Sequence, residues 1–376
     1  MFYQIKVLVL IGLFLFTGRV FAQLSYDFST EQEYNDNPFR SQLATKTLIS
    51  SLDYGIEHNS DLIAIGYSGS YYNFEAVPQR NFYWHQLSAW KNFENSTTGI
   101  FAEQRFGKDI YTYFNYTNVT GYYTNRFNVD DFHIMLSPNV SLAKYPSISI
   151  LDNLKITMNG SVNYGFETGT TFILGGAFTY KKYLDPTQSG TYSYINESNQ
   201  LVAEAYTDRN VSSVTQMLSF LRIAQSITPT TGIASQFTNR SILNGFGSFV
   251  KDLNMIYGDE SEIFDDPVNY EGNNLSIELT QILLDDLTIK GSCFFNNKLY
   301  PSQGIYDEAY NYNTGIMRSD VQQIFTFSMS KNFSLNNSED TSLSAGLKYQ
   351  YINNQSNSVL FNTKANSMSI NIGLNF

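Results

Sequence analysis

The chain ends with residues 367–376, SMSINIGLNF, and the interpretation of the whole sequence starts from this stretch. Every second residue from Met368 to Phe376 is apolar, and the residues between them are Ser, Asn or Gly. Successive side chains of a β-strand point to opposite faces, so this alternation predicts a strand with one apolar and one polar face.

The same alternation recurs through most of the chain. It is clearest in residues 62–72, 132–142, 154–166, 275–283, 287–299, 321–333 and 343–351. Strands of globular proteins have about 5–6 residues, whereas a tilted strand needs about 9–11 to cross a bilayer, and these stretches match the longer class. Their polar faces carry Ser, Asn, Thr and Gly, which suits a hydrated lumen. A soluble all-β protein would also alternate, but we predict an all-β, transmembrane, antiparallel up-and-down β-barrel.

Composition excludes several classes of protein. The chain has 34 acidic and 23 basic residues, a net charge of −11, which argues against a nucleic-acid partner. Aromatic residues make up 16% and charged residues 15%, a balance unlike that of a disordered chain. One cysteine, Cys293, rules out an internal disulfide framework, and its alternation with Phe295 places it on the apolar face. With three histidines besides, we expect no metal site and no cofactor.

Residues 1–22 are predicted to be a secretory signal peptide. Lys6 supplies the positive start, an apolar stretch follows from Val7 to Phe16, and Ala22 provides a small residue at the cleavage position. The stretch is shorter than the about 20 apolar residues that a spanning helix needs. Residues 23–376 would then form a single outer-membrane β-barrel domain in a Gram-negative bacterium.

Sixteen strands give the best division of the chain, although 14–18 can be accommodated. Their predicted starts are near residues 24, 44, 62, 82, 98, 109, 129, 152, 169, 212, 232, 270, 286, 320, 341 and 365. Tight connections alternate with long ones, such as 185–211, 241–269 and 301–319. In bacterial barrels the short turns and both termini are periplasmic, and an even strand number satisfies this rule.

Two stretches resemble known families. The final strand, ending Ile372, Leu374 and Phe376, resembles the last strand of bacterial outer-membrane barrels, which implies recognition by the barrel-assembly machinery. Residues 33–39, EYNDNPF, are similar to the opening of porin-2-like barrels and of surface-lipoprotein-assembly modifiers. Asn35 stands where that opening has its first Asp, and the helical repeats of the modifier group have no room here. These resemblances imply a porin-like barrel in the bacterial outer membrane.

The polar faces supply the candidate functional residues. Alternation assigns to them the charged or titratable residues Asp27, Glu31, Glu33, Glu103, Arg105, Asp131, His133, Lys155, Glu278, Lys290, Lys298 and Lys348. Two readings stay open for this set. In one, opposed acidic and basic side chains line a pore and sort polar solutes. In the other, they pair across the lumen and close it.

Catalytic and metal-binding chemistry finds weaker support. Asp131 and His133 resemble the Asp/His pair of outer-membrane proteases, but solvated strand-end residues explain them more simply. His85 lacks the serine two residues later that a barrel phospholipase needs. The acidic stretch 258–266 fits a solvated outer loop better than a Ca²⁺ loop.

Three functions therefore remain, in descending order. The first is a non-catalytic, porin-like barrel that passes or helps to export polar solutes. The second is a structural barrel with a closed lumen, whose outer loops bind a partner or a surface polysaccharide. The third is a hydrolase at the rim. Outer-membrane lipid and the assembly machinery are the expected partners in each case.

Overall fold

The computed structural model describes residues 24–376, except residues 43, 61, 109–111, 113–114, 148, 186, 196–200, 210–211, 246–269, 284–286, 302 and 336–340. For residues 187–195 and 201–209 it describes the backbone alone. The predicted signal peptide, residues 1–22, lies outside the described residues, and so does the acidic stretch 258–266. No helix within the described part of the chain is long and apolar enough to cross a membrane.

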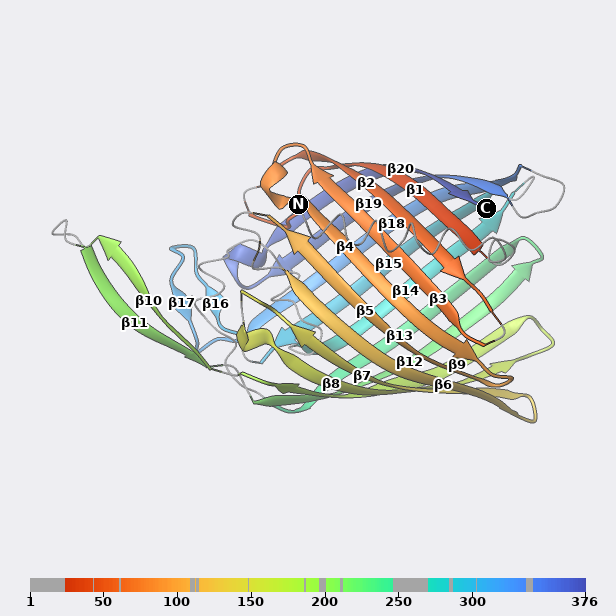
Figure 1. Cartoon of the computed structure of the whole chain (residues 1–376), viewed down its shortest axis with the longest axis horizontal. Coiled ribbons are helices and arrows are strands. Elements are labelled where there is room, and N and C mark those ends of the chain that lie inside the picture. The colour runs from red at the N-terminus through yellow and green to blue at the C-terminus, as the bar shows by residue number, and fades with distance from the viewer. Residues whose placement is uncertain are drawn as a thin grey trace.

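Sixteen strands form one closed antiparallel barrel (Figure 1). They are β1 (Leu24–Asn35), β2 (Thr47–His58), β3 (Ala64–Phe74), β4 (Phe82–Asn92), β5 (Ser96–Gly107), β6 (Tyr116–Val129), β7 (Phe132–Lys144), β8 (Asn153–Gly165), β9 (Thr170–Tyr183), β12 (Ser213–Thr228), β13 (Thr231–Asn244), β14 (Glu271–Ile282), β15 (Thr288–Tyr300), β18 (Arg318–Ser334), β19 (Ser342–Ser356) and β20 (Thr363–Asn375). Each strand pairs with the next along the chain, and β1 pairs with β20 to close the circuit. The predicted fold class and strand number are confirmed.

Within the described parts of the connections lie two small hairpins and three short 3-10 helices. The hairpins are β10 (Thr187–Ile195) with β11 (Leu201–Arg209), and β16 (Ile305–Tyr306) with β17 (Tyr312–Asn313). The helices are η2 (Pro78–Arg80), η4 (Ser149–Leu151) and η7 (Val359–Phe361). Both hairpins project from the same end of the barrel (Figure 1).

The two ends of the barrel differ as the sequence predicts. One end carries the short turns, such as those between β6 and β7 and between β12 and β13, together with the start of β1 and the end of β20. The other carries the long connections, including those that hold the two hairpins. At the short-turn end, Tyr26 and Phe376 exchange two backbone hydrogen bonds of 2.7 and 3.0 Å. By the rule for bacterial barrels, this end is periplasmic.

One predicted boundary is wrong by several residues. The strand expected to begin near residue 109 begins at Tyr116 as β6. Its far end is a tight turn at Asp130 and Asp131, where Asp130 has a φ of 52°. The pairing of β6 with β7 is also interrupted between Tyr122 and Asn125. The register is the same on both sides of the gap, so alternation continues along β6, with Val119, Tyr123 and Phe127 exposed on the outer face.

The register assigns each side chain to one of two faces of the wall. Directly paired residues share a face, so Met368, Tyr34 and Tyr349 lie together. All three are exposed, as are the large apolar side chains of the same phase on nearly every other strand. The opposite phase holds the buried polar residues of the wall, such as Gln216 and Ser369. The exposed apolar phase is therefore the outer face, and the chain is built to lie in the bacterial outer membrane.

The final strand has the predicted orientation. Ile370 and Ile372 are half-exposed on the outer face, at 54% and 50%, whereas Ser369 is buried on the inner face. Cys293 pairs with Ile277 and Phe325 and so also belongs to the outer face.

Candidate functional site

An acidic strip occupies the inner face of β1 and β2. Asp27, Glu31 and Glu33 have the same phase as Ser369 and Asn371 of β20, so their side chains belong to the inner face. Their register with β2 adds two acids that the sequence analysis missed, Asp53 and Glu57. The inner face of these two neighbouring strands thus carries five carboxylates, which we call the acidic wall.

A basic strip lies on the other side of the barrel. Lys155 of β8 pairs with Lys181 of β9 on the inner face, and β12 and β13 contribute Arg222 and Arg240. Lys290 and Lys298 continue the strip on β15. We call these six residues the basic wall. Lys181, Arg222 and Arg240 were not predicted.

Of the missed basic residues, Arg222 could have been found from its outward neighbours, whereas Arg240 lies between the polar Asn239 and Ser241 and Lys181 lies beside Lys182. Leu221 and Ile223 are exposed on the outer face, so Arg222 between them points inward. Two apolar residues, Leu218 and Phe220, share the inner face with Arg222 and obscure the alternation of β12.

The acidic and basic walls are opposed. In the strand order of the barrel, β1 is first and β9 is ninth of sixteen, which places them half a circuit apart. Glu31, Asp53 and Arg222 each lie in the central part of their strands. Charges arranged in this way produce an electric field across the lumen.

The charges of the two walls have different surroundings: Lys181 and Lys298 are buried and lie over the Tyr183 and Tyr270 rings, whereas Arg222 is partly exposed. Arg222 Nη2 and Glu278 Oε1 lie 3.9 Å apart, with side-chain exposures of 35% and 39%, so this is a loose contact in water. Lys155, Lys290 and Lys348 make no ion pair with any described acid. Pairing of Lys155, Lys290 or Lys348 with a lumen acid, together with an inserted loop, would have supported the closed lumen.

Two predicted residues of β5 have local partners. Glu103 accepts a hydrogen bond from Asn118 Nδ2 at 3.1 Å. Arg105 places its guanidinium 4.0 Å from the centre of the Phe82 ring. Both belong to the inner face, because Glu103 pairs with Gln86 and Arg105 with Trp84.

Asp131 and His133 are both exposed, as expected for solvated residues near a strand end, and they do not share the wall. Asp131 lies in the two-residue turn between β6 and β7 and belongs to neither strand, so the prediction that it shares the polar face with His133 is wrong. The turn consumes two residues, which ends the alternation before Asp131. His133 is exposed on β7, and its Nδ1 lies 2.7 Å from Asn128 Oδ1.

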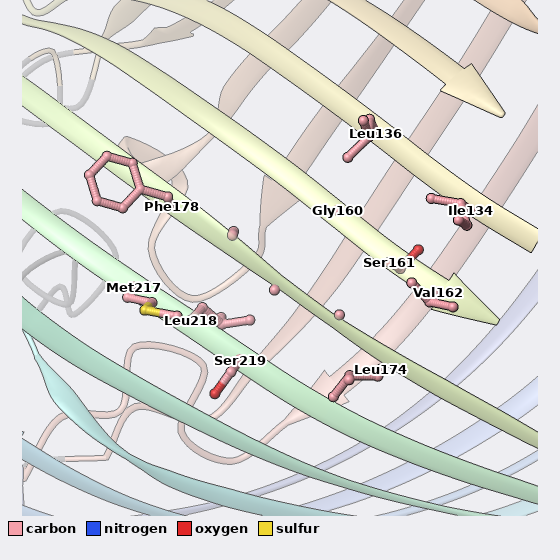
Figure 2. A pocket seen from close by; sticks show the side chains of 13 residues that line it. Ile134, Leu136, Gly160, Ser161, Val162, Leu174, Phe178, Met217, Leu218 and Ser219 are labelled. Atoms are coloured by element: carbon pink, nitrogen blue, oxygen red, sulfur yellow. The ribbon is translucent and has the colours of Figure 1, made fainter. Parts of the chain in front are cut away.

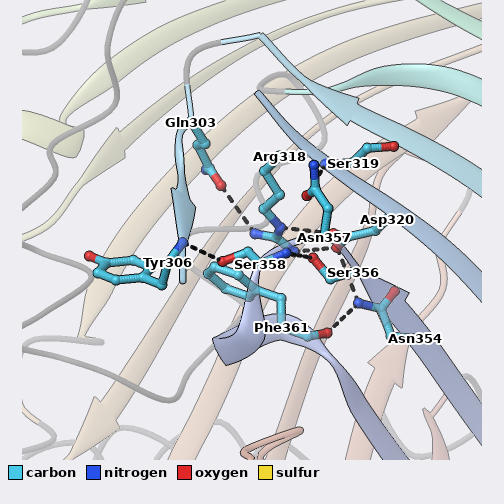
Figure 3. A network of polar contacts seen from close by, with 10 residues as sticks. All are labelled: Gln303, Tyr306, Arg318, Ser319, Asp320, Asn354, Ser356, Asn357, Ser358 and Phe361. Atoms are coloured by element: carbon cyan, nitrogen blue, oxygen red, sulfur yellow. Dashed lines mark hydrogen bonds and ion pairs between the residues drawn. The ribbon is translucent and has the colours of Figure 1, made fainter. Parts of the chain in front are cut away.

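At the long-loop end, the inner face holds a buried polar network (Figure 3). Arg318 Nε donates to Asp320 Oδ1 at 3.0 Å, and Arg318 Nη1 donates to Gln303 Oε1 at 3.1 Å. The guanidinium also lies between the Tyr300 and Phe361 rings, 4.1 and 3.4 Å from their centres. Arg318 and Asp320 are 3% and 1% exposed.

The network attaches a long connection to the wall. Asn354 Nδ2 donates to Asp320 Oδ2 at 3.1 Å, and the backbone amide of Tyr306 in β16 donates to Ser358 Oγ at 2.9 Å. The hairpin of β16 and β17 is thereby joined to the segment that links β19 to β20 (Figure 3).

A hollow of about 460 Å³ opens on the outer face across β7, β8, β9 and β12 (Figure 2). It forms where Gly160 pairs with Gly176, so that no side chain fills the surface, and Leu136, Leu174, Phe178 and Met217 surround it. Its lining is apolar and faces lipid, so it supplies no chemistry to the lumen. Among the residues that the structure describes, no three His, Cys, Asp or Glu side chains gather in a group that could hold a metal ion.

Comparisons with known proteins match the shape alone. No family model matches the sequence, and no curated protein matches it either. Among solved structures, the outer membrane protein OprD from Pseudomonas aeruginosa has a TM-score of 0.49 at 8% identity, with 94% of this chain and 93% of that chain covered. A structure titled bacterial polysaccharide outer membrane secretin has a TM-score of 0.47 at 7% identity, covering 94% of this chain and 98% of that one. At such low identities and TM-scores, the likeness supports no conclusion about function or substrate.

Proposed function

We propose that the protein is a non-catalytic, porin-like channel that lets small polar solutes cross the outer membrane. The observation that carries the proposal is the opposition of the acidic and basic walls across a closed barrel of sixteen strands. Barrels of this strand number are wide enough to enclose an aqueous channel. A field directed across that channel orients solutes that carry a dipole and resists purely apolar ones.

The free-energy cost of placing a charge in lipid also favours the inner face for the residues of the two walls. A basic side chain at the midplane of the lipid face costs about 2–4 kcal/mol, whereas a lumen position exposes it to water. Glu31, Lys155 and Lys348 lie on the inner face, where water is the solvent that stabilises them.

The test is conductance in planar lipid bilayers. We expect the purified protein to open in discrete steps. Replacing Glu31 and Asp53 by Gln and Asn should shift the reversal potential in a salt gradient toward anion selectivity. Replacing Arg222 and Arg240 by Gln should shift it toward cation selectivity.

A matched control is available on the outer face. Lys331 pairs with Ala345 on that face, so Lys331→Gln removes a charge without touching the lumen and should leave selectivity unchanged. Protein that inserts but never opens would overturn the proposal. Equal shifts in one direction from both sets of variants would show that the walls do not act on permeating ions as opposed charges.

The second candidate is a barrel whose outer loops bind a partner or a surface polysaccharide. The observation that favours it is the buried network around Arg318, which holds a long connection in one arrangement. Loss of a bound partner after Arg318→Met, with conductance absent in the unmodified protein, would support this candidate over the channel.

Three further assignments complete the proposal. Ile372, Leu374 and Phe376 would serve as the signal for the barrel-assembly machinery, and outer-membrane lipid would contact the outer face. No catalytic role is proposed, because Asp131 lies in a turn and His133 bonds to an amide. Replacing His133 by Ala should therefore leave any hydrolysis of peptide or lipid substrates at background.

A further inference from the structure

Three aromatic side chains gather on the inner face of β4, β5 and β6. Trp90 of β4 pairs with Gly99 of β5, and Gly99 pairs in turn with Tyr122 of β6. Phe101 lies two residues along β5 from Gly99, and its ring centre is 6.4 Å from that of Tyr122. We call Trp90, Phe101 and Tyr122 the aromatic platform.

Glycines in the wall let two of these rings lie close to the backbone. A methyl group at Gly99 would come within 2.6 Å of the Tyr122 hydroxyl oxygen, and one at Gly66 would come within 3.2 Å of the Trp90 ring. The Tyr122 ring therefore lies over Gly99 of β5, and the Trp90 ring extends toward Gly66 of β3, on the other side of β4.

The platform lies on the water side of the barrel. Its outward neighbours in sequence, Ala89 and Ile100, pair with each other on the outer face, and Ile100 is 52% exposed. All three platform side chains are only partly exposed and none is buried. Lipid contact does not explain aromatic rings at these positions, because membrane girdles lie on the outer face.

Hydrogen-bonding groups border the platform. Ser88 and Thr120 pair directly with Phe101 on either side of it, and Glu57 lies in the same row beyond Gly66. Asn139 pairs with Tyr122 on the side away from Gly99. The wall thus offers apolar ring faces beside a hydroxyl pair, an amide and a carboxylate.

This combination matches one class of solute. A pyranose ring has an apolar C–H face that packs on aromatic rings and a rim of hydroxyls that need donors and acceptors. Binding sites generally pair an apolar surface with a few placed polar groups in this way. An organic cation would also be attracted to the ring faces, but the bordering hydroxyls and amide suit a neutral polyol better.

We propose that the aromatic platform is a binding site for uncharged saccharides on their way through the lumen. The inference rests on the proposed channel function and specifies its solute class. Saccharides would stack on Trp90 and Tyr122 and hydrogen-bond to Ser88, Asn139 and Glu57. The net charge of the walls does not attract an uncharged solute, so the affinity would come from stacking and hydrogen bonds at the platform.

The test is current blockade by a neutral oligosaccharide, with maltohexaose as the probe, in bilayers that hold the open protein. We expect concentration-dependent blockade. Trp90→Ala combined with Tyr122→Ala should raise the half-blocking concentration about tenfold or more, because each stacked aromatic contributes on the order of 1 kcal/mol. Phe294→Ala is the matched control, because Phe294 pairs with Ile324 on the inner face of β15, away from the platform. The saccharide should block this variant at the same concentration as the unmodified protein.

The outcomes separate this inference from the channel itself. Discrete opening steps without blockade by the saccharide would contradict saccharide binding at the platform, but they would leave the proposed channel function standing. Blockade by tetramethylammonium but not by the saccharide would overturn the saccharide assignment in favour of a cation. Equal loss of blockade in the Phe294→Ala control would show that the effect is not specific to the platform. Absence of open steps would count against the proposed function.

Discussion

Two arginine–carboxylate contacts on the inner face have opposite characters. Arg318 and Asp320, at the long-loop end, are almost fully buried and bonded at two points, whereas Arg222 and Glu278 are separated by 3.9 Å and remain over a third exposed. The buried contact holds a connection against the wall. The open contact leaves its charges free to act on the lumen. The same residue types on one face of one barrel thus serve structure in one place and solute selection in another.

The largest expected effect comes from breaking the buried contact. Arg318→Met removes the arginine partner of the buried Asp320, and breaking a buried pair on one side typically costs about 3–5 kcal/mol. We expect a lower urea midpoint in lipid vesicles. The double variant Arg318→Met with Asp320→Leu should recover much of the loss, and failure to recover any of it would argue that the two residues do not act as a pair.

An arginine placed on the lipid-facing side of the wall provides a third environment for the comparison. Phe327 is 44% exposed on the outer face near the middle of β18, and Thr326 beside it faces inward. Phe327→Arg should destabilise the folded barrel by about 2–4 kcal/mol, and Thr326→Arg by much less. Equal costs for the two variants, measured by unfolding in vesicles, would mean that the faces are not solvated differently.

The open contact should matter little for stability. Arg222→Met removes an exposed pair worth about 0–1 kcal/mol. Its expected effect is on ion selectivity instead, in the cation direction. A loss of stability as large as that from Arg318→Met would show that the Arg222 contact stabilises the barrel as much as the Arg318 contact does.

The smallest effect concerns the turn between β16 and β17. The backbone amide of Asn311 donates to Asp307, with further hydrogen bonds from the Asn311 side chain and the Ala309 amide, and these hold the pKa of Asp307 below its usual range. A lowered pKa in the folded state means that the turn is stabilised above the ordinary pKa of Asp and loses this support as pH falls through the lowered value. Amide exchange at Asn311 should therefore accelerate at acidic pH beyond the intrinsic pH dependence, and Asp307→Asn should abolish the extra acceleration.

Much of the barrel is predictable from sequence, since lipid on one side and water on the other impose a period of two. That rule correctly predicted the number of strands and the orientation of residues 367–376, but it placed the start of β6 about seven residues too early. It did not identify Asp53, Glu57, Lys181, Arg222 or Arg240. The inner face tolerates apolar residues such as Leu218 and Phe220, so alternation there is weak.

Other features depend on contacts that no local pattern contains. Asp131 was assigned to a strand because a two-residue turn leaves little trace in hydropathy. The network around Arg318 joins segments that are distant in sequence, from Gln303 to Phe361. Its formation depends on the register of β18 with β19, which only the closed barrel determines.

The most direct test of the account uses the native cysteine. Cys293 on the outer face and Ser292 on the inner face are adjacent in β15. A water-soluble, membrane-impermeant maleimide applied to protein in vesicles should label the variant carrying Ser292→Cys and Cys293→Ser, and should leave the unmodified protein unlabelled. Rapid labelling of Cys293 together with protection of position 292 would contradict the central claim that water fills the inside of the barrel and lipid surrounds it.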